Sequence, residues 1–306
     1  MTRSTPQKKL ERIREIWPML RKLTGPCRAC GRACEVDRPG GVQGLCRAMS
    51  SAGKEVRWLS AHLHFGEEEM LVGRGGSGTV FFSHCTLSCV FCQNWNISQQ
   101  GQGTDHSWEE LAEVFLRLQD EGAENINLVT PTQYIYPIVQ ALERALQEGL
   151  DRPIVYNTNC YDNAELIALL DDVVDIWLPD FKYMCADYGQ KLSAVANYPT
   201  VAKEALRAMY DQGAAVRMEH GVAQKGLIIR HLVLPGGHAG SIEFLNWLQR
   251  EEMMDMSLSI MSQYHPQYQA HRYPEIDKTI TAGEFNAAVD CAEKLGFKAV
   301  IAQRML

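Results

Sequence analysis

The chain has 306 residues, of which 46% are hydrophobic and 22% are charged, and its formal net charge is −7. This length and composition predict a folded chain with one large α/β domain, or such a domain with an appendage. The acidic balance argues against nonspecific nucleic-acid binding, which depends on a positively charged surface. We therefore expect no nucleic-acid partner. We also expect no membrane partner, because no apolar run approaches the roughly 20 residues that a membrane span needs.

Residues 1–24 are predicted to form an N-terminal helical arm. Leu10, Ile13 and Ile16 recur at helical spacing, so one face of this helix would pack on the rest of the protein. Charged residues interrupt the segment, which is therefore not a secretory signal, and Glu11 and Glu15 speak against a mitochondrial presequence. We expect a cytoplasmic protein.

Residues 25–75 are predicted to form a small Cys-rich metal-binding module and a linker. The chain has ten cysteines, and in a reducing compartment clustered thiols more often bind metal or do redox chemistry than form disulfides. Seven of the ten lie between Cys27 and Cys92. The other three are predicted to be small buried hydrophobic residues: Cys160, Cys185 and Cys291.

Residues 76–306 are predicted to form a β/α barrel. Short β-type runs alternate with helical ones that begin at capping residues such as Ser107 with Glu110, Asp162 with Glu165, and Ser241. The predicted strands are Thr79–His84, Asn125–Val129, Pro153–Thr158, Val173–Leu178, Leu227–Leu234, Met256–Met261 and Lys298–Ala302. Strands that are apolar on both faces and separated by helices indicate a parallel sheet covered by helices. The expected fold is α/β, with a partial (β/α)6-type barrel, the helical arm and the Cys-rich module.

Polar residues follow the predicted strands, at the edge of the sheet where β/α folds place their active sites. After the second to sixth strands come the sequences VTPTQY, NTNCYD, PDFKYM, LPGGH and SQYHP. Before the first strand, His62 and His64 are followed by Glu67, Glu68 and Glu69. We interpret this stretch as an edge strand that leads into a solvated turn; the alternative interpretation places His62 or His64 near the substrate.

Three cysteines follow the first strand directly, with the spacing C-x3-C-x2-C: Cys85, Cys89 and Cys92. Three thiolates can hold three irons of a [4Fe–4S] cluster and leave the fourth iron open to an exogenous ligand. Catalytic zinc sites keep a vacancy in the same way, whereas structural ones are closed by four protein ligands. The motif therefore predicts an iron–sulfur site at which chemistry takes place.

The motif C-x3-C-x-Φ-C, with Phe91 at its aromatic position, resembles the signature of the radical S-adenosylmethionine (SAM) superfamily. The wider sequence GSGTVFFSHCTLSCVFCQN resembles the pyruvate formate-lyase activating enzymes, and more closely their PflX-type branch. The likeness continues through NINLVTPTQY, VYNTN, DIWLPDFKYM, RHLVLPGG and SQYHPQY. Two positions depart from the family, since His84 and Cys160 stand where it usually has glycine.

The resemblance implies a radical SAM barrel whose [4Fe–4S] cluster is held by the three cysteines. It implies that the open iron binds SAM, that one electron cleaves the sulfonium bond, and that a 5′-deoxyadenosyl radical then abstracts hydrogen from a substrate. The substrate would be a protein, a peptide or a small molecule, and reduced flavodoxin or ferredoxin would supply the electron. Cofactor contacts are expected from Phe91, Asn157, Asn159, Asp180, Lys182, Arg230, Gln263 and His265.

Some of these assignments have a chemical rationale. The Asp180 carboxylate suits the ribose hydroxyls of SAM, and the Lys182 ammonium suits its methionyl carboxylate. For Arg230 a structural ion pair is an equal alternative. Gln263 and His265 compete for one role, that of a SAM-contacting side chain after the sixth strand.

A second cysteine set has the spacing C-x2-C-x3-C-x11-C, which is typical of a closed four-thiolate site: Cys27, Cys30, Cys34 and Cys46. The segment has so few apolar residues that bound metal would supply its folding energy. Spacing alone does not choose between zinc and a second iron–sulfur cluster.

A different class of function would be a non-catalytic iron–sulfur or zinc protein for electron transfer or interaction. The missing fourth ligand beside Cys92 and the polar loops at the strand ends argue against this alternative.

Overall fold

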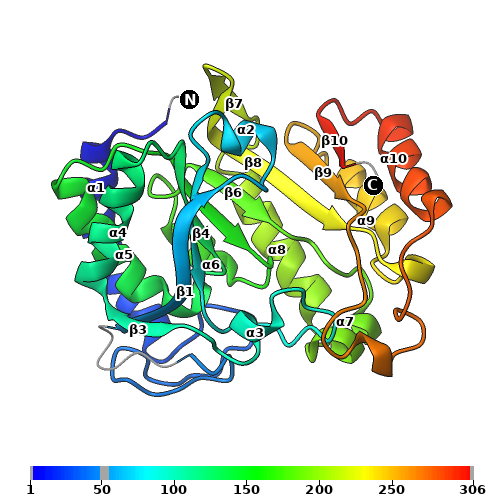
Figure 1. Cartoon of the computed structure of the whole chain (residues 1–306), viewed down its shortest axis with the longest axis horizontal. Helices are drawn as coiled ribbons and strands as arrows, with labels where there is room; N and C mark the ends of the chain where they lie inside the picture. Colours follow the sequence, from blue (N-terminus) through cyan, green and yellow to red (C-terminus); the bar gives the residue numbers. More distant parts are fainter. Residues whose placement is uncertain (1–2, 49–54, 304–306) are drawn as a thin grey trace.

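The computed structural model describes residues 3–48 and 55–303, which form an α/β fold on a mixed sheet (Figure 1). Within those ranges ten strands follow the order β10-β9-β8-β6-β5-β4-β2-β1-β3, with β7 paired to β8. Seven neighbouring strands are parallel: β2 (Ser77–Phe82), β4 (Asn125–Val129), β5 (Ile154–Thr158), β6 (Ile176–Pro179), β8 (Val222–Leu232), β9 (Ser257–Met261) and β10 (Val300–Gln303). Each corresponds to one predicted strand, and all but β10, whose residues 300–302 are half-buried or exposed, are largely buried.

Three antiparallel strands were not predicted as strands of the main sheet: β1 (Glu55–His64), β3 (Thr104–Ser107) and β7 (Arg217–Glu219). In β1 buried and exposed positions are mixed, and every residue of β7 is exposed. Such segments lack the continuous apolar run that marks a strand covered on both faces. His62 and His64 lie in β1, as expected, on the part that pairs with β2 alone.

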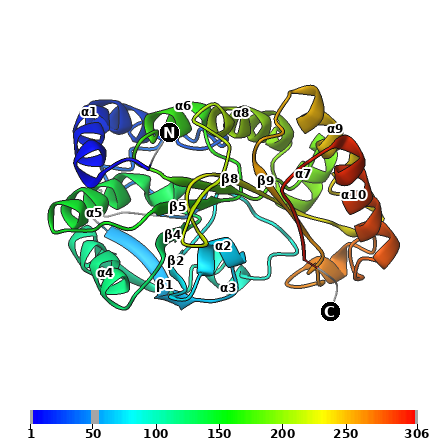
Figure 2. The same cartoon turned by 90° about the horizontal axis from the view of Figure 1, so that it is seen from above.

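Helices cover the outer side of the curved sheet, as the view from above shows (Figure 2). They are α1 (Pro6–Thr24), α2 (Glu69–Val72), α3 (Trp95–Ser98), α4 (Trp108–Asp120), α5 (Ile135–Gln147), α6 (Ala164–Leu169), α7 (Ala186–Ser193), α8 (Tyr198–Tyr210), α9 (Ser241–Arg250) and α10 (Ala282–Leu295). The short α2 and α3 lie on the opposite, inner side (Figure 2). In the described part of the chain, no helix is long and apolar enough to cross a membrane.

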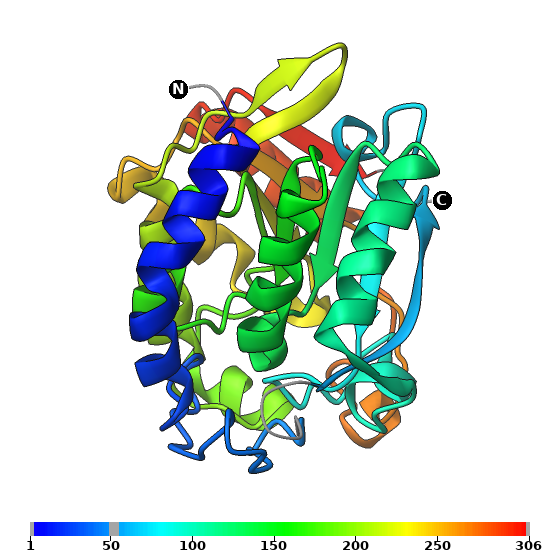
Figure 3. The ribbon, with the colours of Figure 1, turned by 90° about the vertical axis from the view of Figure 1, so that its left-hand side faces the viewer.

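The predicted N-terminal helix is confirmed as α1, which runs beside the helices of the body (Figure 3). Its apolar face is buried at Leu10, Ile13 and Ile16 and belongs to the main hydrophobic core. A buried ion pair between Lys9 and Asp175 also ties α1 to the start of β6. The helix is thus part of the folded body and covers the sheet together with α5 and α6.

One of the three predicted helix caps is confirmed. Ser107 and Glu110 form a capping box at α4. The expected box at Asp162 is wrong, because Asn163 caps α6 by accepting from the Glu165 amide. The expected cap at Ser241 is also wrong: this residue begins α9, and its hydroxyl hydrogen-bonds the ring of His231 instead.

The scattered cysteines differ from one another in burial. Cys160 is buried, as predicted, but Cys185 is exposed and Cys291 is half-buried. The prediction is therefore wrong for the last two.

Residues 25–48 lie at the end of the sheet toward which the parallel strands point (Figure 1). The Gly31 amide donates to the Tyr161 carbonyl (3.0 Å), and Cys30 forms a bridge with Asp162. These contacts place the Cys-rich segment against the loop that follows β5. Both cysteine sets consequently lie at the same edge of the sheet.

Candidate functional site

A cavity of about 380 Å³ opens at the carboxyl ends of the parallel strands. It brings together most of the predicted site residues: Cys85, Cys89, Phe91, Cys92, Asn157, Asn159, Asp180, Lys182, Arg230 and Gln263. His265 is exposed and does not line the cavity, whereas its neighbour Tyr264 does. Of the two residues expected to compete for one role, the structure thus brings only Gln263 to the cavity.

The cysteine loop, residues 85–92, directs each of its three sulfurs toward a hydrogen-bonding group. The Asn159 amide donates to the Cys85 sulfur (3.2 Å), and the Ser193 hydroxyl donates to that of Cys89 (2.9 Å). The Cys92 sulfur lies 3.2 Å from the Ser98 hydroxyl. N–H and O–H donors of this kind stabilise negatively charged sulfur, so the loop fits a group held by thiolates.

Burial strongly disfavours free thiolates at this place. Burial is the main cause that raises the pKa of Cys85 to about 12, and the neighbouring Cys89 is the second cause. Burial also raises the pKa of Cys89. Cys85 and Cys89 are therefore protonated when nothing is bound, and binding of a metal cluster must release their protons.

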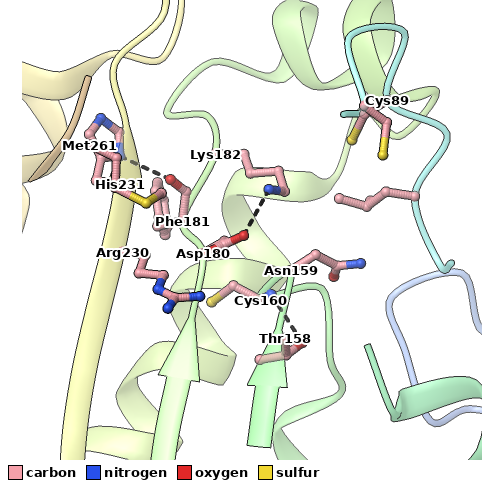
Figure 4. A network of polar contacts seen from close by, with 12 residues as sticks. Cys89, Thr158, Asn159, Cys160, Asp180, Phe181, Lys182, Arg230, His231 and Met261 are labelled. Atoms are coloured by element: carbon pink, nitrogen blue, oxygen red, sulfur yellow. Dashed lines mark hydrogen bonds and ion pairs between the residues drawn. The ribbon is translucent and has the colours of Figure 1, made fainter. Parts of the chain in front are cut away.

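Asp180 and Lys182 follow β6 on the other side of the cavity. The Lys182 ammonium donates to one Asp180 oxygen (3.3 Å), and Figure 4 shows its side chain turned toward that carboxylate. Burial opposes the charge of Lys182, but the Asp180 carboxylate outweighs it and raises the pKa of Lys182.

The second oxygen of Asp180, Oδ1, is buried and has no hydrogen-bond partner among the described residues. Buried polar atoms are nearly always satisfied in native proteins, by protein groups, by water or by a ligand. Because Asp180 lines the cavity, this oxygen is placed to accept from a hydroxyl of a bound molecule.

The two positions that depart from glycine share one backbone conformation. His84 has φ 67° and Cys160 has φ 63°, both in the left-handed region that glycine adopts most easily. The chain thus keeps the turns that glycine would make and accepts the strain of a side chain at each. The His84 ring lines the cavity beside Cys85, where burial and the nearby Arg47 lower its pKa to about 4. It is a neutral imidazole at neutral pH.

Arg230, at the end of β8, is fixed by two carboxylates. Its guanidinium donates to Glu67 and Glu68, and the Nε–Oε1 distance to Glu68 is 2.9 Å. Glu68 is buried, so the prediction of a solvated turn is wrong at this residue, whereas Glu69 is exposed as predicted. Burial would raise the pKa of Glu68, but Arg230 outweighs it and holds that pKa below its ordinary value.

Glu67 lines the cavity and is a part of the site that was not expected. Its carboxylate accepts from the amide of Asn127 (3.1 Å) as well as from Arg230. The sequence offers no local signal for this arrangement, because the arginine lies more than 160 positions away along the chain.

The loop after β9, residues 262–281, closes against the cysteine loop. The Gln269 amide donates to the Val90 carbonyl (2.8 Å), and the Gln93 side chain donates to the Gln263 carbonyl (3.0 Å). Phe91 packs edge-on against Tyr264, with 5.7 Å between the ring centroids. Phe91 therefore holds the cysteine loop in the apolar wall of the cavity.

The second cysteine set is also gathered in space. Cys27, Cys30 and Cys46 are buried and Cys34 is half-buried. The buried Arg38 guanidinium donates to the sulfurs of Cys27 (3.3 Å) and Cys46 (2.8 Å). Among the described residues, no three His, Cys, Asp or Glu side chains are arranged to hold a single metal ion.

Comparison with known proteins identifies a sequence family for part of the chain. Residues 79–218 match the model of the Radical SAM superfamily. Uncharacterized protein MJ0674 of Methanocaldococcus jannaschii is 32% identical over 277 residues, which cover 88% of this chain and 74% of that protein.

Two solved structures are loosely similar. The structure of TYW1 with a lysine-pyruvate adduct bound has a TM-score of 0.41 and 14% identity, over 70% of each chain. The crystal structure of HydG, a maturase of the [FeFe]-hydrogenase, has a TM-score of 0.48 and 11% identity, over 99% of this chain and 65% of that one.

Proposed function

Because the chain belongs to the radical SAM superfamily, we propose that Cys85, Cys89 and Cys92 hold a [4Fe–4S] cluster and that the adjoining cavity binds SAM. With SAM bound, such a cluster would supply the electron that cleaves the sulfonium bond, and the resulting 5′-deoxyadenosyl radical would remove hydrogen from a substrate. One observation carries this proposal. Three hydrogen-bonded cysteine sulfurs of one loop share a cavity with the unsatisfied carboxylate oxygen of Asp180.

The polar side chains of the cavity have distinct proposed roles. Asp180 accepts a ribose hydroxyl through Oδ1, and the Lys182 ammonium binds the methionyl carboxylate. Asn157 and Gln263 line the cavity as further polar contacts. Asn159 orients Cys85 through its hydrogen bond to the sulfur. These side chains fix the orientation of SAM, while the closed loops exclude water from the reacting atoms.

Arg230 has a positioning role in this proposal. Because Glu67 and Glu68 accept hydrogen bonds from its Nε and Nη2 atoms, it shapes the wall of the cavity and keeps Glu67 in place. The same wall is not well suited to an anionic group, since Glu67 faces the cavity. His265 is exposed and does not line the cavity, so it has no cofactor contact in this proposal.

The resemblance to the PflX-type branch of the pyruvate formate-lyase activating enzymes supports a narrower proposal. We place the enzyme among activase-like radical SAM oxidoreductases, with a partial (β/α)6-type barrel over residues 76–306 and a metal-binding module within residues 25–75. The substrate is a protein, a peptide or a small molecule, the electron donor is reduced flavodoxin or ferredoxin, and the setting is cytoplasmic. The second cysteine set holds zinc or an auxiliary iron–sulfur cluster.

The proposed function is tested by anaerobic reconstitution with iron and sulfide, followed by reduction with dithionite in the presence of SAM. We expect about four irons at the cysteine loop and formation of 5′-deoxyadenosine and methionine in equal amounts. Deuterium transfer from candidate substrates into 5′-deoxyadenosine would then identify the substrate class. No 5′-deoxyadenosine over many hours, from protein with a full complement of iron, would contradict the proposal.

Lys182→Ala should weaken SAM binding. A charged hydrogen bond contributes about 1.5–3 kcal/mol, so we expect the Kd to rise by roughly 10- to 150-fold. Anaerobic titration calorimetry on the reconstituted protein measures this directly. Lys203→Ala is the matched control, because its ammonium lies over the Trp247 ring, away from the cavity. An unchanged Kd for Lys182→Ala would remove this residue from the SAM site.

A further inference from the structure

The segment of residues 21–48, here called the basic module, carries charge of the opposite sign to the rest of the protein. It contains six basic and two acidic side chains, a net charge of +4 in a chain of net charge −7. Within the described ranges, none of its six basic side chains forms an ion pair with a carboxylate. Arg21, Lys22 and Arg28 are exposed. Such a surface attracts acidic partners and steers their approach.

Apolar side chains are exposed within the same module. Leu45 is 64% exposed and Val42 is 48% exposed, and the Leu45 backbone hydrogen-bonds Cys34. An apolar contact beside a charged rim is the usual composition of a protein–protein interface. Because the half-buried Cys34 hydrogen-bonds the Leu45 backbone, it is the thiol of the second set that lies next to these exposed apolar side chains.

Two short connections link the basic module to the cysteine loop. The Arg32 guanidinium, two residues from Cys30, donates to the carbonyl of Thr86 (2.5 Å), which adjoins Cys85. On the other side, Arg47 donates to the Gln99 carbonyl (2.7 Å).

The second connection continues to the same sulfur. The Gln99 side chain donates to the Leu87 carbonyl (3.3 Å), and the Leu87 amide donates to the Cys85 sulfur (3.4 Å). Two paths of covalent bonds and hydrogen bonds thus end at Cys85. One path begins at Arg32, which follows Cys30, and the other begins at Arg47, which follows Cys46. A centre held by the second cysteine set would be joined to the SAM site by both paths.

Arg38 places a positive charge beside the second set. Its guanidinium is buried and donates to two of the four sulfurs. Positive charge and N–H donors at the sulfurs stabilise the more negative, reduced form of an iron–sulfur cluster and raise its potential. An oxidised four-iron cluster with four thiolates carries a charge of about −2, so the module stays positive overall.

We propose that the basic module docks an acidic protein that carries one electron, and that its four thiolates hold an iron–sulfur cluster through which this electron reaches the cysteine loop. This inference rests on the proposed function, because it names the partner and the entry point for the electron that SAM cleavage consumes. One electron leaves the reduced carrier and ends on the cluster at Cys85. The carrier leaves oxidised by one electron, and no bond forms or breaks during the transfer.

The docking part is tested with a reduced, acidic [2Fe–2S] ferredoxin, whose reoxidation by the reconstituted full-length protein is followed by stopped-flow absorbance. Lys22→Glu/Arg28→Glu should slow this reaction by about tenfold or more at low salt, and added salt should slow the wild-type protein toward the variant. Arg21→Glu/Lys22→Glu serves as a second variant if the first does not load iron. Arg250→Glu, which reverses an exposed charge on α9, is the matched control.

Titanium(III) citrate supplies a reference rate for each variant, because a small reductant needs no docking surface. Ferredoxin-driven rates that are equal in the wild type and the charge-reversed variant would overturn the docking proposal, even if titanium(III) citrate drives SAM cleavage normally. Failure of SAM cleavage with titanium(III) citrate in the wild type would instead contradict the proposed function.

The metal part is tested in Cys89→Ala, which leaves the second cysteine set as the main metal site. We expect about four irons per chain in this variant and an electron paramagnetic resonance (EPR) signal after reduction. Zinc in place of iron would overturn the relay, because zinc has no redox chemistry.

Discussion

Cys89→Ala is expected to abolish iron binding at the cysteine loop and to reduce formation of 5′-deoxyadenosine to background. Two cysteines can hold only two corners of a four-iron cluster, so about four irons per chain should be lost. The substitution also leaves the Ser193 hydroxyl without its sulfur acceptor. Iron analysis, the visible spectrum and the SAM cleavage assay measure the consequences in the same anaerobic preparation.

Two comparisons make the Cys89→Ala result specific. Cys185→Ala removes an exposed cysteine at the start of α7 and should change neither iron content nor activity. Metal at Cys27, Cys30, Cys34 and Cys46 should survive Cys89→Ala, because these thiols belong to a separate segment. Loss of both metals together would show that the two cysteine sets form one site and would contradict their assignment as separate centres.

Arg230→Met is expected to destabilise the protein by about 3–5 kcal/mol, because removing one partner of a buried ion pair leaves an uncompensated buried charge. Here two carboxylates would be left, since the side chains of Glu67 and Glu68 are 8% and 1% exposed. Urea unfolding of wild type and variant, in the same metal-loaded state, gives the difference in free energy of unfolding.

The triple variant Arg230→Met/Glu67→Gln/Glu68→Gln should recover most of this loss, because no buried charge remains. Arg14→Met, which breaks an exposed contact with Glu143, should cost less than about 1 kcal/mol. If Arg230→Met lowers the free energy of unfolding as little as Arg14→Met does, then Glu67 and Glu68 are solvated and do not form a buried ion-pair network with Arg230.

The same network predicts a pH dependence. The pKa of Glu68 lies below its ordinary value of 4.5 in the folded protein. Its contribution to stability is therefore fully present at neutral pH and is lost as the pH falls from about 4.5 through the lowered pKa. The penalty for Arg230→Met should accordingly shrink at acid pH. A penalty that stays constant from pH 7 to pH 4 would contradict the assignment of the charged pair.

The parallel part of the sheet could be predicted from the sequence because its strands are apolar on both faces. Asn125–Val129 was predicted with its observed bounds, and the loops after the strands do meet at one cavity. The antiparallel strands β1, β3 and β7 could not be predicted in the same way. Their residues are partly or wholly exposed, and their pairing depends on partners elsewhere in the chain.

Within the site, the cysteines and the pair Asp180–Lys182 could be predicted because each follows a strand directly. The role of Glu67 and Glu68 could not, since a run of three acidic residues is usually solvated. Their burial is made favourable mainly by Arg230, at the end of β8, which is far away along the chain. Asp162 was mistaken for a helix cap because its carboxylate instead accepts hydrogen bonds from Thr132, 30 residues away, and from Tyr156 and Thr158 of the preceding strand.

The open corner of the cluster is tested most directly by EPR of the reduced Cys27→Ala/Cys30→Ala variant, in which the second set keeps only two of its four thiolates. We expect addition of SAM to shift the spectrum of the cluster at Cys85, Cys89 and Cys92, because SAM binds the iron that has no protein ligand. A spectrum that is identical with and without saturating SAM would show that this iron is already occupied, and would contradict the proposed open iron at this site.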